Sequence, residues 1–185
     1  RCLHCDEICS VCTTVCPNLA NYTYATLPAT YQVYRIKRDG QQGYLPEQLA
    51  PFSVSQTWQI INLADFCNAC GNCHTFCPAH SAPYLEKPRL HFGMESFRAS
   101  EKGFYLEKSA GIMRLWFKQD GREFSLEKHP EYFSLESQEC TSRLDVISLR
   151  LLDVRWKLPE ATETDTAMAP VMAVVMQAAA DIVPY

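Results

Sequence analysis

Short segments in which apolar and polar residues alternate fill the middle of the chain. The clearest are residues 103–108, 112–118 and 122–127, which are rich in Phe and Leu and are separated by short Gly-containing turn sequences. Segments of this length and composition are typical of β-strands joined by tight turns. We therefore predict a three-stranded antiparallel meander, joined by residues 90–92 as a fourth strand.

The C-terminal part of the chain contains one ambiguous segment and one clear helix. In residues 144–158 apolar positions recur at helical spacing, with Ser142 and Asp145 placed as a capping box, although the last part also alternates as a strand would. We adopt the helix. Residues 159–166 are polar and acidic and predict a linker. Residues 167–183 are apolar on nearly all sides, which predicts a buried helix, and about 17 residues is short for a membrane span.

The first third of the chain has few helical signals, because Pro28, Pro46 and Pro51 interrupt it. The dipeptide Asp39-Gly40 is a hairpin-turn sequence, so we expect an inserted β-hairpin over about residues 30–46. Residues 58–63 predict a strand.

Composition excludes several classes of protein. The chain has 185 residues, of which 47% are hydrophobic and 21% charged, with a net charge of −4. These values exclude a wholly disordered or collagen-like chain, and the negative charge gives no support for nucleic-acid binding. No signal peptide precedes the first cysteines, so we expect a cytoplasmic protein with no membrane span. Because a ligand run follows Arg1 at once, we expect a piece of a longer polypeptide.

Nine of the ten cysteines lie in the first 77 residues, and this clustering indicates the chemistry. The second run is C-x2-C-x2-C-x3-C-P, formed by Cys67, Cys70, Cys73, Cys77 and Pro78. This is the bacterial-type ligand pattern for [4Fe–4S] clusters, in which the fourth Cys ligates the other cluster when two are present. Three thiolates from one tight loop bind three irons, and the fourth points away from that loop.

The first run repeats this pattern with one irregularity. Cys9, Cys12 and Cys16, followed by Pro17, have the expected spacing, but Cys5 is one residue too far upstream. We prefer Cys5 as the first ligand, with Cys2 as the alternative. The predicted ligands are therefore, for cluster one, Cys5, Cys9, Cys12 and Cys77 and, for cluster two, Cys67, Cys70, Cys73 and Cys16.

Zinc binding and disulfide formation are the alternative roles for these cysteines. Structural zinc usually uses cysteine pairs separated by a dozen or more residues. Disulfides pair poorly between cysteines three residues apart in a tight loop. We expect Cys140, more than sixty residues after Cys77, not to be a ligand, and we find no catalytic residue constellation.

The ligand runs resemble a known family. Residues 61–73 resemble the entry into the ligand loop of two-cluster bacterial ferredoxins. More narrowly, both runs resemble the C-terminal iron–sulfur segment of the family named "putative selenate reductase subunits", which is related to the small subunit of glutamate synthase and to dihydropyrimidine dehydrogenase. The resemblance is specific over residues 1–21 and 58–85 and rests on these residues: Cys2, Leu3, Cys5, Asp6, Cys9, Val11, Cys12, Val15, Cys16, Pro17, Asn18, Ala20, Asn21, Cys67, Asn68, Cys70, Gly71, Asn72, Cys73, Thr75, Phe76, Cys77, Pro78, Ser81, Ala82, Pro83 and Tyr84.

The resemblance implies an oxidoreductase whose FAD and NADPH sites lie upstream of Arg1. It implies as partners the upstream flavin domain of the same polypeptide and a redox partner subunit. We therefore expect an α+β protein: a two-cluster bacterial ferredoxin-like domain at 1–89 with an insertion at about 22–57, a small antiparallel β-rich extension at 90–160, and a linker and C-terminal helix at 161–185. Its expected function is electron transfer, with no catalytic site of its own. The alternatives are a zinc-binding interaction module without a redox role and an independent ferredoxin whose β-rich tail binds a partner.

Overall fold

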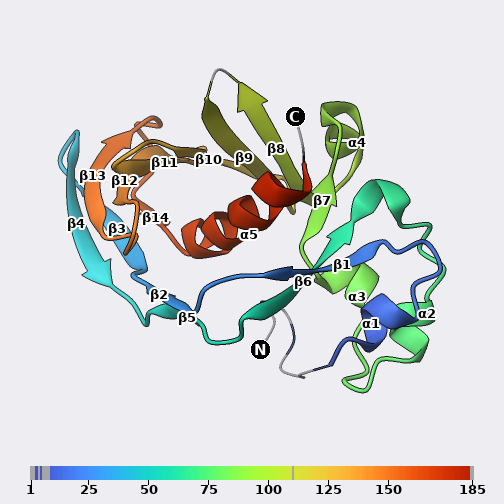
Figure 1. Ribbon diagram of the computed structural model, residues 1–185. Coiled ribbons are helices and arrows are strands. Elements are labelled where there is room, and N and C mark those ends of the chain that lie inside the picture. The colour runs from blue at the N-terminus through green and yellow to red at the C-terminus, as the bar shows by residue number, and fades with distance from the viewer. Residues whose placement is uncertain (1–2, 4, 6–8, 110, 184–185) are drawn as a thin grey trace.

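The protein is built around one large mixed β-sheet. Figure 1 shows the computed structural model, which describes residues 3, 5, 9–109 and 111–183. The nine strands lie in this order across the sheet: β1 (Asn21–Ala25), β6 (Trp58–Leu63), β7 (Arg89–His91), β8 (Gly103–Ser109), β9 (Ile112–Gln119), β10 (Arg122–Lys128), β11 (Tyr132–Glu136), β12 (Cys140–Asp145) and β13 (Leu151–Trp156). Strand β7 pairs in parallel with both of its neighbours, and the other pairs are antiparallel.

Within the described residues, two small sheets and six helices complete the fold. One small sheet has the order β14 (Glu163–Asp165), β3 (Tyr34–Asp39) and β4 (Gly43–Gln48), and the other pairs β2 (Ala29–Tyr31) with β5 (Phe52–Val54). The helices are α1 (Val11–Thr14), the 3-10 helix η1 (Ala64–Phe66), α2 (Asn72–Thr75), α3 (Pro83–Glu86), α4 (Met94–Ala99) and α5 (Met168–Ile182). In Figure 1 the strands curve around α5, and α1, α2 and α3 gather at one end of the molecule.

The main core lies between α5 and the inner face of the sheet. Leu106, Leu115 and Leu126 come from the inner face of β8, β9 and β10, and Met172 and Val175 come from α5. Strand residues alternate between the two faces, so the alternating pattern of the sequence supplies one apolar face. Burying α5 on nearly all sides explains why its sequence lacks a polar face.

The expected α+β fold with a small ferredoxin-like domain is wrong, because the protein is mostly β and its nine-stranded sheet includes strands from both halves of the chain. The connection is the parallel pair β6–β7, in which Asn62 lies opposite Arg89 and Leu63 opposite Leu90. A three-residue strand carries too little pattern to reveal its partners. The division at residues 89 and 160 stays a prediction, although β7 spans the first of these positions.

Several expected elements are confirmed. The meander is β8–β9–β10, and β7 joins it, although in parallel. Strand β6 coincides with the strand expected over residues 58–63. The predicted hairpin is β3–β4, with Asp39 opposite Gly43 and Gly40 at a φ of 66°. The C-terminal helix is α5, and in the described part of the chain no helix is long and apolar enough to cross a membrane.

The helix expected over residues 144–158 is wrong, because this segment contains the end of β12, a turn and β13. Asp145 does not cap a helix. Its Oδ1 accepts hydrogen bonds from the backbone N–H groups of Ile147 and Ser148 and from the Ser148 hydroxyl, which holds the turn between the strands. Pairing on both sides of β12 overrides the helical spacing. The expected linker likewise contains β14, which pairs with β3.

Candidate metal centre

The two cysteine runs fold in the same way. In each run a one-turn helix begins two residues after the second cysteine, α1 after Cys9 and α2 after Cys70. The same backbone hydrogen bonds recur at matching positions: Thr14 N to Ser10 O (3.1 Å) and Thr75 N to Gly71 O (3.0 Å), Val15 N to Val11 O (3.0 Å) and Phe76 N to Asn72 O (3.1 Å), and Leu19 N to Cys16 O (3.2 Å) and His80 N to Cys77 O (3.1 Å). The repeat in the sequence is therefore also a repeat in backbone structure.

The left-handed residue at the end of each repeat is not glycine. Leu19 and His80, each three residues after the fourth cysteine, have φ angles of 53° and 52°. Non-glycine residues rarely adopt this conformation. Its recurrence at both positions indicates that the turn after each Cys-Pro is a specific feature of the repeat.

The structure brings cysteines of both runs to one small cavity. The cavity is lined by Cys5, Cys9 and Cys12 from the first run and by Cys77 from the second, together with Ile60, Pro78, Ser81, Pro83 and Lys87. These four cysteines are the set expected for cluster one. Cys2, the alternative to Cys5, lies outside the described residues.

The other four cysteines lie on neighbouring elements. Cys16 follows α1, Cys73 lies within α2, and these two helices contact each other. Cys73 shares a small apolar cluster with Cys12 and Ile60. Cys67 is half-buried and Cys70 is exposed. The contact between α1 and α2 is thus the observation that supports grouping Cys16 with Cys67, Cys70 and Cys73.

Hydrogen bonds reach the fourth cysteine of each run. The backbone N–H of Ala20 donates to Cys16 Sγ at 3.2 Å, and Ser81 Oγ lies 3.3 Å from Cys77 Sγ. Burial of the Cys77 thiol favours a higher pKa, but hydrogen bonds from Ser81 and the Ala79 backbone and the positive charge of Lys87 together lower the pKa below its ordinary value. Donors at these positions suit a thiolate.

A buried amide pair anchors the first run to the sheet. Asn21 Nδ2 donates to the carbonyl oxygen of Cys12 at 2.8 Å, and Asn62 Nδ2 donates to Asn21 Oδ1 at 3.0 Å. On the other run, Asp65 Oδ2 accepts the backbone N–H of Phe92 at 2.6 Å, which fixes the chain two residues before Cys67. Both runs are thus held against β1, β6 and β7.

The cavity has four cysteines, which is the number of thiolate ligands that one cubane takes. Among residues 3, 5, 9–109 and 111–183, no three Cys, His, Asp or Glu side chains come close enough together to hold one metal ion. In a cubane each thiolate binds a different iron, so the ligands surround a cavity instead of converging on one point. The four cysteines line one cavity, and Ser81 Oγ lies 3.3 Å from the sulfur of Cys77.

The residues that support the cysteines were not predicted in that role. Nothing local marks Asn21, Ser81 or Lys87 as supporting residues. Asn62 carried a detectable signal, because apart from Gln59 it is the polar residue of an apolar strand. Cys140 lies in β12, buried in a separate cluster with Ile36 and Trp156. That Cys140 is not a ligand stays a prediction.

The chain is similar to a protein known from two strains of one bacterium. The chain is 31% identical over 116 residues to "Putative oxidoreductase YgfK" of Escherichia coli strain K12, and equally to the protein of the same name from Escherichia coli O157:H7. The match covers 62% of this chain but 9% of each relative, so the chain corresponds to a small part of their length. No protein-family profile and no solved structure matches it.

Proposed function

We propose that this chain is an electron-transfer unit that binds two [4Fe–4S] clusters. Cluster one is held by Cys5, Cys9, Cys12 and Cys77, and cluster two by Cys67, Cys70, Cys73 and Cys16. The observation that carries the proposal is the shared cavity, because it joins three cysteines of the first run to the last cysteine of the second. This exchange of the fourth ligand is what the spacing of a two-cluster protein requires.

The protein's own residues bury, orient and polarise the ligands. When bound, the clusters supply one-electron transfer. Ala20 and Ser81 direct hydrogen bonds at Cys16 and Cys77, which stabilise the thiolate form of these side chains. Asn21 fixes the backbone of the first run through the Cys12 carbonyl. Ile60 supplies an apolar wall of the cavity and keeps water away from one side of it.

The unit belongs, in this proposal, to a larger oxidoreductase. The similarity to a relative named as an oxidoreductase supports a redox role, and the ligand runs support an iron–sulfur one. An FAD- and NADPH-binding part of the same polypeptide would be the electron donor, and a redox partner subunit the acceptor. The unit itself needs no catalytic residues, because it relays electrons.

Metal analysis tests the two-cluster assignment. The full chain prepared without oxygen should contain about eight irons and eight acid-labile sulfides and should be brown. Iron near four per chain would contradict two clusters, and stoichiometric zinc in anaerobic material would establish the zinc-binding module instead.

Pairs of substitutions in the full chain test the exchange of ligands. Cys9→Ala with Cys77→Ala removes two ligands of one proposed cluster, so about four irons should remain. Cys73→Ala with Cys77→Ala removes one ligand from each, so both clusters should be damaged and the iron should fall well below that level. The opposite ranking of the two double variants would show that each run keeps its own fourth cysteine.

A further inference from the structure

Lys87 occupies a fixed position at the edge of the cysteine cavity. Its backbone N–H donates to the carbonyl oxygen of Pro83 at 3.1 Å, and the carbonyl oxygen of the next residue, Pro88, accepts the backbone N–H of Asn62 at 2.8 Å. A residue before proline is restricted to extended conformations, and Lys87 has φ −64° and ψ 153°. The backbone on both sides of Lys87 is therefore anchored to α3 and β6.

The Lys87 side chain is buried beside the four cysteines. The residue is 3% exposed and lines the cavity with Cys5, Cys9, Cys12 and Cys77. No carboxylate of the described residues forms an ion pair with it. In a site of low polarity a positive charge interacts strongly with a negative charge placed beside it. The polar side chains that line the cavity together with Lys87 are those of the four cysteines and Ser81.

A cluster in this cavity would place negative charge beside Lys87. Four thiolates and a 2+ cubane core give a net charge of about −2, and reduction by one electron makes it about −3. A nearby positive charge interacts more strongly with the more negative state. Lys87 would therefore stabilise the reduced cluster more than the oxidised one.

We propose that Lys87 is the counter-charge of the cluster held by Cys5, Cys9, Cys12 and Cys77 and that it raises the reduction potential of that cluster. This inference rests on the proposed function. In this role Lys87 does not bind iron; its charge stabilises the reduced state of the cluster. A hydrogen bond from the Ser81 hydroxyl to Cys77 acts in the same direction.

The repeat provides no equivalent of Lys87 for the other cluster. Ser81 is matched in the first run by Ala20, which offers its backbone N–H alone. After the repeat ends at Leu19 and His80, the first run continues into β1 and the second into α3, so Lys87 lies on a segment that has no counterpart in the first run. In this proposal the counter-charge favours residence of the electron in the cavity that Lys87 lines.

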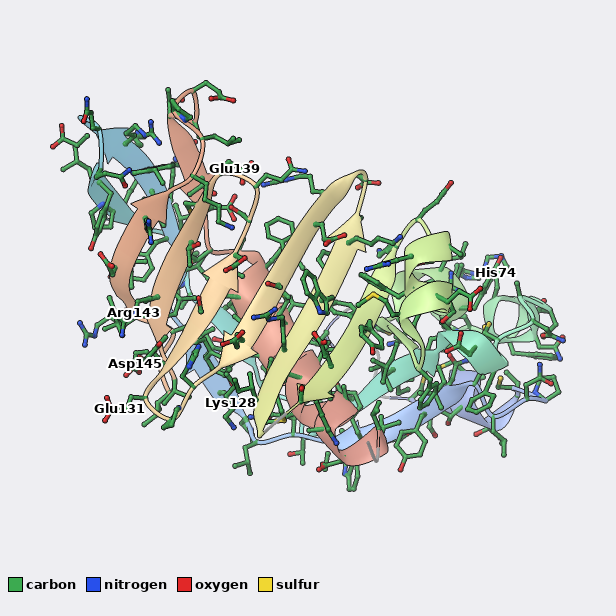
Figure 2. All side chains as sticks on the ribbon, turned by 90° about the horizontal axis from the view of Figure 1, so that it is seen from above. His74, Lys128, Glu131, Glu139, Arg143 and Asp145 are labelled. Carbon is green, nitrogen blue, oxygen red and sulfur yellow. The ribbon has the colours of Figure 1, made fainter. Side chains whose placement is uncertain are left out.

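The test is a redox titration of the anaerobic full chain, followed by electron paramagnetic resonance. Lys87→Met and Lys87→Gln remove the charge and Lys87→Arg keeps it. Lys157→Gln is the matched control, because it removes the charge of a lysine whose backbone bonds to Glu139, at the end of the molecule opposite His74 in Figure 2. Iron content is measured on every sample.

In the neutral variants one of the two midpoint potentials should fall. At a fixed ambient potential, the ratio of reduced to oxidised cluster should drop at least tenfold, which is about 59 mV for a one-electron couple. Lys87→Arg should stay near the wild-type potential. Loss of about four irons, one cluster's worth, from both neutral variants but not from Lys87→Arg would also support the counter-charge.

Two negative results are distinguishable. A full iron content with both potentials shifted no more than in Lys157→Gln would overturn the role of Lys87 and leave the proposed function standing. A wild-type chain that binds no iron would overturn the proposed function itself.

Discussion

Replacing Asn21 by alanine should destabilise the protein at the junction between the first cysteine run and the sheet. Asn21 is 5% exposed, and its side chain makes the hydrogen bonds to the Cys12 carbonyl (2.8 Å) and from Asn62 (3.0 Å). The substitution removes one hydrogen bond from each of two buried polar groups, the Cys12 carbonyl and the Asn62 amide. Each such group costs about 1–3 kcal/mol, and some water entry reduces the sum, so we expect a loss of about 2–4 kcal/mol in the free energy of unfolding.

The assay is urea unfolding of the anaerobic full chain, together with the rate at which a chelator removes iron. Thr23→Ala is the control, because Thr23 lies in the same strand, β1, and is exposed. Asn21→Ala should lower the unfolding midpoint and speed iron loss, while Thr23→Ala should change the free energy by less than about 1 kcal/mol. Equal effects of the two substitutions would refute the argument that buried hydrogen bonds hold the ligand run.

Three further predictions concern residues around the sheet. Gly103→Ala should cost about 1–3 kcal/mol, because a Cβ there would lie 2.6 Å from the His91 ring and 3.2 Å from the carbonyl oxygen of Arg89. Combining it with His91→Ala should relieve the part of that cost due to the ring in the same urea assay; full additivity would refute the contact. Burial lowers the pKa of His91, and the charge of Asp65 opposes this effect. The unfolded state therefore binds the His91 proton more strongly, so the contribution of neutral His91 to stability should be complete above a pH of about 6.5 and be lost as the pH falls below that value. The variant His91→Gln should lack this pH dependence. Cys140→Ser should leave the iron content unchanged, and loss of one cluster's iron would make Cys140 a ligand.

Local patterns sufficed for elements whose partners are adjacent in the sequence. Strands β8, β9 and β10 each pair with the next, and the turn at Asp120 and Gly121 has the positive φ angles that a tight hairpin needs. Alternation along the strand and turn residues at its ends are then both local signals. The same holds for β3 and β4.

Patterns failed where a distant partner decides the structure. Residues 144–158 satisfy both helical and strand periodicities, and pairing of β12 with β11 and β13 selects the strand. The parallel pairing of β7 with β6 and β8 depends on segments that do not follow one another as hairpins. Contacts of this kind produce no periodicity within the strand itself, so the α+β expectation could not be corrected from the sequence.

In the candidate site, too, the local features could be predicted and those that depend on distant contacts could not. Cysteine spacing indicates the ligands, because the geometry of a cubane constrains positions only a few residues apart. The supporting residues are fixed by tertiary contacts: Lys87 reaches the cavity because Pro88 bonds to β6, and Asn21 reaches Cys12 because β1 pairs with β6. Neither residue has a spacing from the cysteines that cubane geometry dictates.

The position of the two runs makes the proposed clusters part of the sheet's own stability. The first run leads into β1 at Asn21, the second follows β6 through η1, and β1 and β6 pair along their length from Asn21–Asn62 to Ala25–Trp58. A cluster in the shared cavity would tie Cys12 to Cys77 at one end of this ladder and so close a long loop, and its binding energy would count as folding energy. Strands β8 to β10 pair through hairpins of their own and pack against α5 on the far side of β7. Loss of iron should therefore loosen the β1–β6 edge first. Lys87 and Asn21 are anchored to that edge, so the environment that sets the reduction potential of the cluster depends on the same strand pair that the cluster stabilises.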